Sequence, residues 1–181
     1  LARYLVGRKR VIWGFKWQDE PRYAQVFSDS DWGGTARDRK STSGGVWMLG
    51  EHCIKTWSCS QGPYALSSAE AELYAMVEGV CRAKGMMSLA WELGFRGLSN
   101  VVRLGTDSSA AKSFVNRRGL GKMRHLQIRD LWLQKEVAEG NLEVSKIPGE
   151  RNPADLMTKI LGRKEIHDRL AWMNLEAEWG G

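Results

Sequence analysis

Four carboxylates stand where expected strands end or expected helices begin. Asp29 and Asp107 each follow or close a run of strand-like residues, so both fall at strand ends. Glu72 lies in the first turns of a long helical stretch, and Asp155 lies in the first turn of a later helix. Carboxylates gathered at one sheet edge repel one another unless a divalent cation lies between them, and oxygen ligands suit Mg²⁺ or Mn²⁺. Such a cluster is the one needed for two-metal hydrolysis of a phosphodiester.

Each of these carboxylates also has a purely structural interpretation. Asp155, at the third position of its helix, could satisfy free backbone N–H groups, and Asp107 could cap the helix that follows it. Asp29 or Asp31 could be a solvated strand end. The spacing of the residues leaves both interpretations open.

Three glutamates of the long helical stretch separate on a helical wheel. Glu70 completes a capping box with Ser67 and needs no catalytic role. At about 100° per residue, Glu72 lies about 50° from the centre of the apolar stripe, Glu70 about 110° from it, and Glu78 nearly opposite. The stripe comprises Ala69, Met76, Val80, Ala83 and Met87. Glu72 is therefore expected at the edge of the buried face, where a metal ligand would be, and Glu78 in solvent beside Arg82.

The order of elements that would position these side chains predicts an α/β domain with a mixed sheet and helices packed on it. Strand-like runs come first, and later strands alternate with helical stretches. The expected strands are 11–17, 23–29, 45–49, 53–59, 101–106 and 142–147. The expected helices run from the capping box at 67–70 to about 93, over 109–116 and 123–138, from Asn152-Pro153 onward, and over 163–172. The polar stretch 32–43 is expected to be a surface loop.

The composition indicates one soluble domain with a real core. The chain has 181 residues, of which 43% are hydrophobic, and it lacks the run of about 20 apolar residues that a membrane span needs. Cys53, Cys59 and Cys81 form no CxxC pair and are odd in number, so we expect reduced cysteines in an intracellular protein. A net charge of +6 indicates a polyanionic partner only weakly. Because the chain begins at Leu1, we expect it to be a segment of a longer protein.

Six ordered motifs lie along residues 28–159: Ser28 to Gly34, Asp38 to Val46, Ala65 to Glu72, Thr106 to Ala111, Arg124 to Arg129, and Asn152 to Lys159. Together they closely resemble the ribonuclease H domain of copia-type LTR-retrotransposon Pol polyproteins. The resemblance implies a ribonuclease H-like fold, a five-stranded mixed sheet with helices on both faces. It also implies an endonuclease that hydrolyses the RNA strand of RNA–DNA hybrids during reverse transcription and leaves a 3′ hydroxyl and a 5′ phosphate.

The resemblance assigns the same four carboxylates. It implies that Asp29, Glu72, Asp107 and Asp155 are the catalytic residues and hold two Mg²⁺ ions, with Mn²⁺ as a possible substitute. Asp31 belongs to the motif without being an expected ligand. An inactive nucleic-acid-binding or structural module of the connection type is the alternative; loss of one of the acids would favour it, and all four are present. A decayed element is a third alternative that the sequence does not exclude.

The resemblance further divides the chain and names its partners. It implies the end of a reverse transcriptase or connection segment over 1–22, a ribonuclease H-like domain over 23–160, and a helical extension over 161–181. The expected partners are the RNA–DNA hybrid and the reverse transcriptase domain of the same polyprotein, without a membrane. The expected location is the cytoplasm, in a virus-like particle, or the nucleus.

Two departures from the family pattern occur. The loop before the last carboxylate, 148–152, contains no histidine, although many ribonucleases H carry a mobile one there that is thought to help product release. The absence of this histidine is expected to affect the rate of product release more than the cleavage step itself. Thr35 follows Gly34 where the family usually has an acidic residue, and this position lies outside the metal-binding set.

A basic run over 117–129 is the best candidate for binding the hybrid backbone. It holds five Lys or Arg residues and no acid before Asp130. The candidate substrate contacts are Arg117, Arg118, Lys122, Arg124 and His125. A solvated basic loop and a packed structural histidine are the alternatives. Arg37, Arg39 and Lys40 form a second candidate surface, while four tryptophans in strand-like runs, Trp13, Trp17, Trp47 and Trp57, are expected to pack rather than stack on bases.

Overall fold

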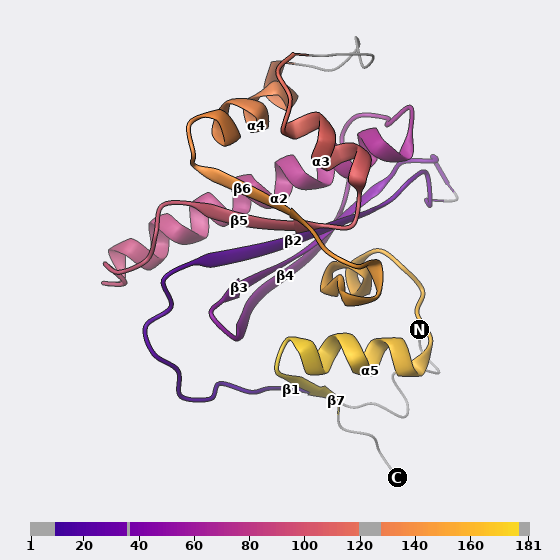
Figure 1. Ribbon diagram of the computed structural model, residues 1–181. Helices are drawn as coiled ribbons and strands as arrows, with labels where there is room; N and C mark the ends of the chain where they lie inside the picture. Colours follow the sequence, from indigo (N-terminus) through magenta and orange to yellow (C-terminus); the bar gives the residue numbers. More distant parts are fainter. Residues whose placement is uncertain (1–9, 36, 120–127, 178–181) are drawn as a thin grey trace.

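A five-stranded mixed sheet forms the centre of the protein. The structure is a computed structural model, and it describes residues 10–35, 37–119 and 128–177. The strands lie in the order β4–β3–β2–β5–β6 (Figure 1). β2 is antiparallel to β3, and β3 to β4, while β5 runs parallel to β2 and β6 parallel to β5. The strands are β2 (Ala24–Asp31), β3 (Thr42–Leu49), β4 (His52–Ser60), β5 (Val102–Thr106) and β6 (Leu142–Lys146). The mixed sheet expected from the sequence is confirmed.

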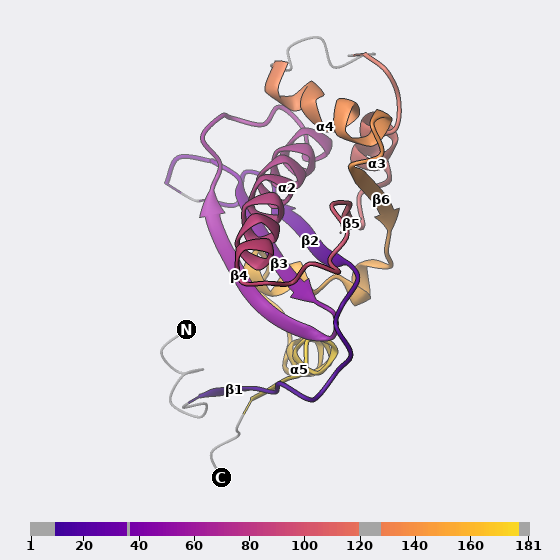
Figure 2. The same cartoon turned by 90° about the vertical axis from the view of Figure 1, so that its left-hand side faces the viewer.

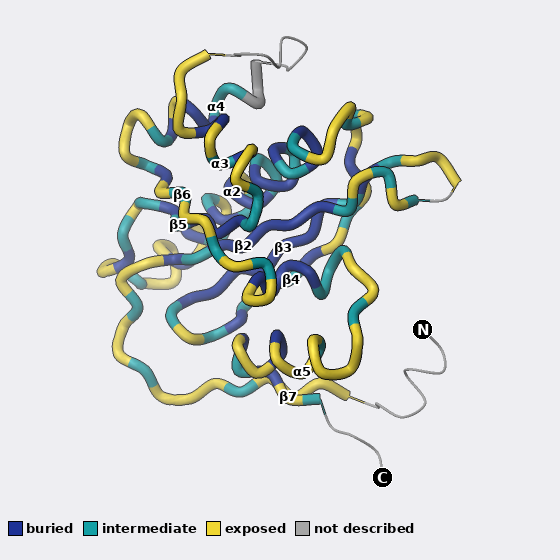
Figure 3. Tube along the Cα trace, turned by 45° about the vertical axis from the view of Figure 1, so that its right-hand side comes forward, coloured by how far each residue is buried: buried dark blue, intermediate teal, exposed yellow. Residues whose placement is uncertain are grey.

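Helices cover both faces of this sheet, as alternate strand residues show. Val26 and Trp47 face one hydrophobic cluster, and their neighbours Phe27 and Val46 face another. The first cluster includes residues of α2 (Ser68–Glu92), α3 (Ser109–Val115) and α4 (Ile128–Ala138). The second includes residues of α5 (Arg163–Trp172) and of the 3₁₀ turn Pro153–Met157 that precedes it (Figure 2). The sheet is therefore the buried middle layer (Figure 3).

The long helix begins at the N-cap that the sequence predicts, Ser67. The Ser67 hydroxyl accepts from the Glu70 backbone N–H at 3.2 Å, and Gly94 follows the last turn with φ +99°, a conformation that favours glycine. α4 begins at Ile128, and residues 123–127 of the expected helix lie outside the described residues. Within the described ranges, none of the helices combines the length and apolarity needed to cross a bilayer.

The helix expected after Asn152 is a short 3₁₀ turn. η1 (Gly149–Arg151) and η2 (Pro153–Met157) form two consecutive 3₁₀ turns. Asn152 caps η2 as expected, because its Oδ1 accepts from the Ala154 N–H at 3.1 Å. The turn ends because Thr158 leaves helical geometry, with φ −128°, and its hydroxyl donates to the Asp29 carboxylate. The short turn thus brings residues after 157 back onto β2.

The segments on either side of the main domain meet in a second, two-stranded sheet. β1 (Val11–Trp13) pairs antiparallel with β7 (Leu175–Ala177) beside α5 (Figure 2). The prediction that the strand tryptophans pack was right for Trp47 and Trp57 and wrong for Trp13 and Trp17, which are 40% and 95% exposed. Trp13 lies in β1, which pairs with β7 and not with the five-stranded sheet, and Trp17 lies beyond the end of β1.

Candidate active site

Three of the four predicted carboxylates converge at one edge of the sheet. Asp29, Glu72 and Asp107 each bring one carboxylate oxygen within 4.8 Å of the others. Because β2 and β5 are adjacent and parallel, the end of β2 and the residue after β5 meet at the same edge. The capped first turn of α2 brings Glu72 to that edge.

Asp29 is buried and already accepts two hydrogen bonds. Its side chain is 1% exposed, the Thr158 hydroxyl donates to Oδ2, and Lys159 Nζ donates to Oδ1 at 3.0 Å. Burial raises the pKa of Asp29 above its ordinary value, although the Thr158 hydrogen bond and the Lys159 charge oppose that shift.

Glu72 has one anchored oxygen and one without a partner. Its Oε1 accepts from the Ser30 backbone N–H at 3.2 Å and from the Ser30 hydroxyl at 2.8 Å. Oε2 is buried and accepts no hydrogen bond in the described part of the chain. Burial first, and the negative charge of Asp29 second, raise the pKa of Glu72 to about 8. An unpartnered, buried carboxylate oxygen beside two more carboxylates fits a hard divalent cation such as Mg²⁺ or Mn²⁺.

Asp155 lies near the cluster but is paired with two cations. Its side chain is 5% exposed, Lys159 Nζ lies 2.7 Å from Oδ1, and Arg169 Nη2 lies 2.7 Å from Oδ2. Lys159 therefore bridges Asp29 and Asp155. Its partial burial alone would lower the pKa of Lys159, but the hydrogen bond to Asp155 and the charge of Asp29 hold that pKa above its ordinary value.

Two of the structural alternatives are not seen. Asp107 does not cap the next helix, because the Ser108 hydroxyl accepts from the Ala111 N–H at 3.2 Å and fills that role. Asp155 does not satisfy the free N–H groups of η2 with its carboxylate, which pairs with the two cations, and the Asn152 amide caps the turn instead. Neither carboxylate therefore fills the backbone-capping role that the sequence allowed for it.

The wheel position of Glu70 was misleading. Glu70 is 1% exposed, although the wheel places it far from the apolar stripe. Its Oε2 accepts from the Leu66 N–H at 2.8 Å and its Oε1 accepts from the Tyr74 hydroxyl. The chain before α2 folds over the first turn and buries this carboxylate, which does not belong to the cluster. Glu78 pairs with Arg82 at 2.6 Å, as expected.

The metal-free protein is expected to lose stability as the pH rises from about 5 to about 8. Folded Glu72 keeps its proton to about pH 8, whereas the unfolded chain releases it near the ordinary value of 4.5. In that window the folded state binds more protons, so the free energy of unfolding falls with pH, by at most about 1.4 kcal/mol per pH unit for this group. Urea unfolding in EDTA across this range measures the slope.

Glu72→Gln is expected to flatten that slope, and Glu92→Gln, on the exposed end of the same helix, is expected to leave it unchanged. Some slope remains in Glu72→Gln because the raised pKa of Asp29 acts in the same direction. An equal slope for Glu72→Gln and the intact chain would contradict the assignment to Glu72.

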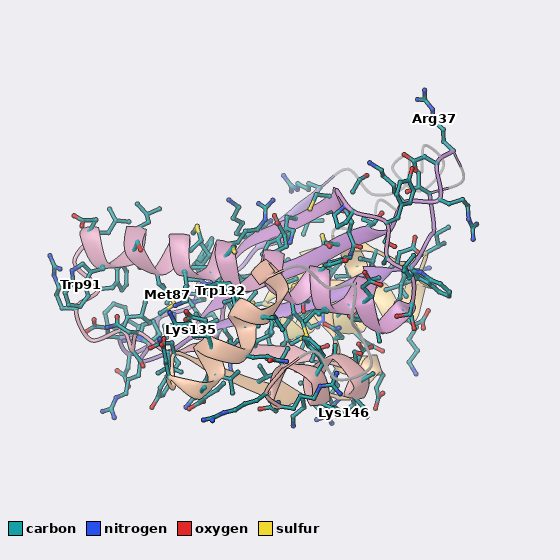
Figure 4. The ribbon with its side chains drawn as sticks, turned by 90° about the horizontal axis from the view of Figure 1, so that it is seen from above. Arg37, Met87, Trp91, Trp132, Lys135 and Lys146 are labelled. Carbon is teal, nitrogen blue, oxygen red and sulfur yellow. The ribbon has the colours of Figure 1, made fainter. Side chains whose placement is uncertain are left out.

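The predicted basic surface is only partly described. Arg117 and Arg118 are exposed after α3, and the Arg117 guanidinium lies 4.8 Å from the Phe114 ring centroid. Lys122, Arg124 and His125 lie outside the described residues. In the second candidate surface, Arg37 extends away from the sheet (Figure 4).

Sequence reasoning missed three residues around the carboxylates: Thr158, Lys159 and Arg169. The spacing of Asp155 and Lys159, four residues apart, could have indicated their ion pair. Arg169 left no local signal, since it lies 14 residues after Asp155 on a separate helix. Lys146 (labelled in Figure 4) is a further missed cation: it lies opposite Thr106, the residue before Asp107, and its Nζ donates to the Ser109 hydroxyl.

Curated relatives of the chain are retrotransposon polyproteins. It is 30% identical over 140 residues to the "Retrovirus-related Pol polyprotein from transposon TNT 1-94" of Nicotiana tabacum, covering 77% of this chain and 10% of that protein. It is 31% identical over 138 residues to the Pol polyprotein from transposon RE1 of Arabidopsis thaliana, covering 76% of this chain and 9% of that protein. It is 30% identical over 156 residues to the truncated transposon Ty1-A Gag-Pol polyprotein of Saccharomyces cerevisiae, covering 84% and 13%. The chain thus spans about a tenth of the length of these relatives.

Solved structures with the same fold are ribonucleases H. RNase H1 from Halobacterium salinarum matches with a TM-score of 0.50 at 15% identity, covering 75% of this chain and 93% of that one. LC11-RNase H1, isolated from compost by a metagenomic approach, matches with a TM-score of 0.54 at 14% identity, covering 75% and 92%. No protein-family model matches the chain. The relatives and the fold together show that the chain belongs to the retrotransposon Pol polyproteins, as a domain with the ribonuclease H fold.

Proposed function

We propose that this domain is a metal-dependent endonuclease that hydrolyses the RNA strand of RNA–DNA hybrids during reverse transcription. The observation that carries the proposal is the convergence of Asp29, Glu72 and Asp107 within 4.8 Å, with one Glu72 oxygen buried and unpartnered. Two bound Mg²⁺ ions would activate water and stabilise the leaving oxygen at such a cluster. The ribonuclease H fold and the polyprotein relatives support this choice of substrate.

The residues in and around that cluster have different proposed roles. Asp29, Glu72 and Asp107 supply ligand oxygens from three different elements, and Asp155 is the proposed fourth ligand. Ser30 holds Glu72 Oε1 through its backbone and its hydroxyl, which directs Oε2 away from Ser30. Lys159 offsets the charge of Asp29 and Asp155 and is half-exposed, so it is free to exchange its carboxylate contacts for solvent or for a phosphate.

A non-catalytic nucleic-acid-binding module is the second candidate. The engagement of both Asp155 oxygens by Lys159 and Arg169 favours it, because a carboxylate committed to two cations offers fewer free ligand atoms. The two candidates differ in one measurable respect, since both would bind the hybrid and only the first would cut it.

The deciding experiment is cleavage of an end-labelled RNA–DNA hybrid by the intact chain in Mg²⁺ and in Mn²⁺. The expected result is internal cutting of the RNA strand alone, with 3′ hydroxyl and 5′ phosphate ends, and no cutting in EDTA or of duplex DNA. Binding of the hybrid without cutting under either metal would establish the second candidate instead.

We also propose that this domain works as one part of a longer polyprotein. The proposed division is 1–22 as the end of the reverse transcriptase or connection segment, 23–160 as the nuclease domain and 161–181 as its extension. The reverse transcriptase of the same polyprotein is the proposed partner, in a cytoplasmic virus-like particle or in the nucleus. The support is that the relatives are Pol polyproteins about ten times the length of this chain.

The basic run is expected to bind the hybrid through phosphates rather than through base edges. Replacing Arg117 and Arg118 by Gln is expected to weaken hybrid binding and to lower the slope of log K against log salt by up to about 0.9 for each phosphate that is no longer neutralised. Base sequence is expected to have no effect, since an A-form-like duplex is recognised by shape and 2′-OH contacts. A fluorescence anisotropy series over salt concentration measures both quantities.

Lys55→Gln with Lys164→Gln is the matched control for charge, because both lysines are exposed and lie outside the run. The same slope for the arginine variant and the intact chain would remove this surface from the proposal.

A further inference from the structure

An arginine of the C-terminal extension is buried against the fourth carboxylate. Arg169 of α5 is 6% exposed, and its Nη2 donates to Asp155 Oδ2 at 2.7 Å. A buried guanidinium is unfavourable unless its N–H groups find partners. Three backbone carbonyls accept its other donations: Asn152 O from Nε at 3.3 Å, Glu165 O from Nη1 at 3.3 Å, and Gly149 O from Nη2 at 3.4 Å. The guanidinium thus fixes both the Asp155 carboxylate and the turn that carries it.

The turn that Arg169 anchors also lies against the rest of the site. Asn152 is fully buried, and its Nδ2 donates at 3.1 Å to the carbonyl of Ser28, the residue just before the first carboxylate. A methyl group added at Gly149 would lie 3.3 Å from Asp107 Oδ2, so the turn approaches that carboxylate closely. A shift of this turn would therefore disturb the surroundings of both Asp29 and Asp107.

Apolar contacts hold α5 against the sheet and therefore fix the position of the Arg169 backbone. Leu170 and Met173 are buried in one cluster with Phe27 of β2. The Trp172 ring packs edge-on against Phe27, with centroids 5.1 Å apart. α5 lies on the face of the sheet opposite α2 (Figures 1 and 2). The guanidinium is thus presented from a rigid support rather than from a loose tail.

The two cations that pair with Asp155 contact different oxygens and differ in exposure. The Arg169 side chain is 7% exposed and takes Oδ2, whereas the Lys159 side chain is 40% exposed and takes Oδ1. Lys159 Nζ also contacts Asp29 Oδ1, so the Oδ1 atoms of the two carboxylates face the same cation. With Oδ2 held by Arg169, Oδ1 is the oxygen that Asp155 directs toward Asp29.

We propose that Arg169 is a positioning residue that holds Asp155 with Oδ1 directed toward the carboxylate cluster, which makes α5 part of the active site. This inference rests on the proposed function, in which Asp155 is the fourth metal ligand. Arg169 acts through Asp155 and Asn152 and does not itself belong to the cluster. Loss of a partner that orients a metal ligand lowers metal affinity by about 10- to 100-fold.

Mn²⁺ titration of the intact, substrate-free chain by calorimetry tests the inference without an activity readout. Arg169→Met, which keeps length and removes charge, is expected to bind Mn²⁺ at least about tenfold more weakly under conditions where circular dichroism shows it folded. Lys164→Met, on the exposed side of the same helix, is the matched control and is expected to bind as the intact chain does. The double variant Asp155→Asn, Arg169→Met is expected to bind Mn²⁺ no more weakly than Asp155→Asn alone, because both changes act on the same ligand, Asp155.

Unchanged Mn²⁺ affinity in folded Arg169→Met, or losses that multiply in the double variant, would overturn the inference. If Arg169→Met does not fold, Arg169→Lys decides, because an ammonium cannot hold Oδ2 and three carbonyls together. Weaker Mn²⁺ binding in Arg169→Lys supports the inference, and unchanged binding overturns it. An intact chain that binds Mn²⁺ but does not cut the hybrid would remove the proposed function alone. An intact chain that cuts the hybrid, beside a folded Arg169→Met that binds Mn²⁺ as tightly as the intact chain, would remove this inference alone.

Discussion

Asp107→Asn is expected to lower the rate of hybrid cleavage by on the order of 10³-fold while the fold stays intact. Metal-assisted stabilisation of the reacting oxygens contributes several kcal/mol to phosphodiester hydrolysis, and each 1.4 kcal/mol is about tenfold in rate. Asparagine keeps the size of the side chain and removes the charge that holds the cation. The fold is expected to survive because Ser108, not Asp107, caps α3.

Single-turnover cleavage of the labelled hybrid in Mg²⁺ measures this loss, and urea unfolding in EDTA measures the fold. The metal-free variant is expected to be at least as stable as the intact chain, since removing one of three carboxylates within 4.8 Å relieves repulsion. Asp168→Asn, an exposed change of the same kind on α5, is the control and is expected to cut at the intact rate. Equal rates for Asp107→Asn and the intact chain would contradict the metal-site assignment.

Short-range patterns predict that each of the three carboxylates lies at or near the end of a strand or the start of a helix, and the family resemblance implied that they converge. Asp29 closes one run of strand residues, Asp107 follows another, and Glu72 lies two residues after a capping-box acid. Alternating strand and helix runs predict a mixed sheet, and adjacent parallel strands place their ends at one edge. The ends of the individual elements follow from residues fewer than ten positions apart, whereas the pairing of β2 with β5, which brings Asp29 and Asp107 to one edge, is a long-range contact that the family resemblance implied.

The surroundings of Asp155 were not predictable because they depend on chain path. The motif at Asn152-Pro153 predicts a cap correctly but does not give the length of the helical segment after it, which is a 3₁₀ turn rather than an α-helix. Arg169 reaches Asp155 only because the chain returns over the second face of the sheet as α5. The burial of Glu70 has a similar cause, since the segment around Leu66 folds over its carboxylate.

The adjacent glycines Gly44 and Gly45 link the packing of the sheet to the site. Gly44 lies opposite Asp29 on the neighbouring strand. A methyl group on Gly44 would lie 2.7 Å from Met157 Cβ and 2.6 Å from Thr158 Cγ2. These two residues end the 3₁₀ turn whose Thr158 hydroxyl donates to Asp29. A methyl group on Gly45 points to the opposite face and would lie 2.0 Å from Trp57 Cζ2, beneath α2.

Gly44→Ala and Gly45→Ala are therefore each expected to lower the free energy of unfolding by about 1–3 kcal/mol, the usual effect of overpacking. Only Gly44→Ala is expected to lower cleavage per folded molecule, by about tenfold or more, because misplacing a catalytic group by about 1 Å has a large effect on rate. The Ser58 hydroxyl donates to Met157 O at 2.6 Å, so the turn cannot relax by moving away from β4 freely. The added methyl group must instead displace Thr158, whose hydroxyl donates to Asp29.

Urea unfolding and single-turnover cleavage of both variants, at a temperature where each is folded, separate the two effects. Gly45→Ala is the matched control, because it adds the same methyl group one residue along the same strand, on the face that does not carry the turn. Equal loss of cleavage in both variants would mean that general loosening of the sheet, and not displacement of the turn, limits the rate. A loss confined to Gly44→Ala would show that the close approach of the turn to β3 requires glycine, since that approach keeps Asp29 and its neighbours in place.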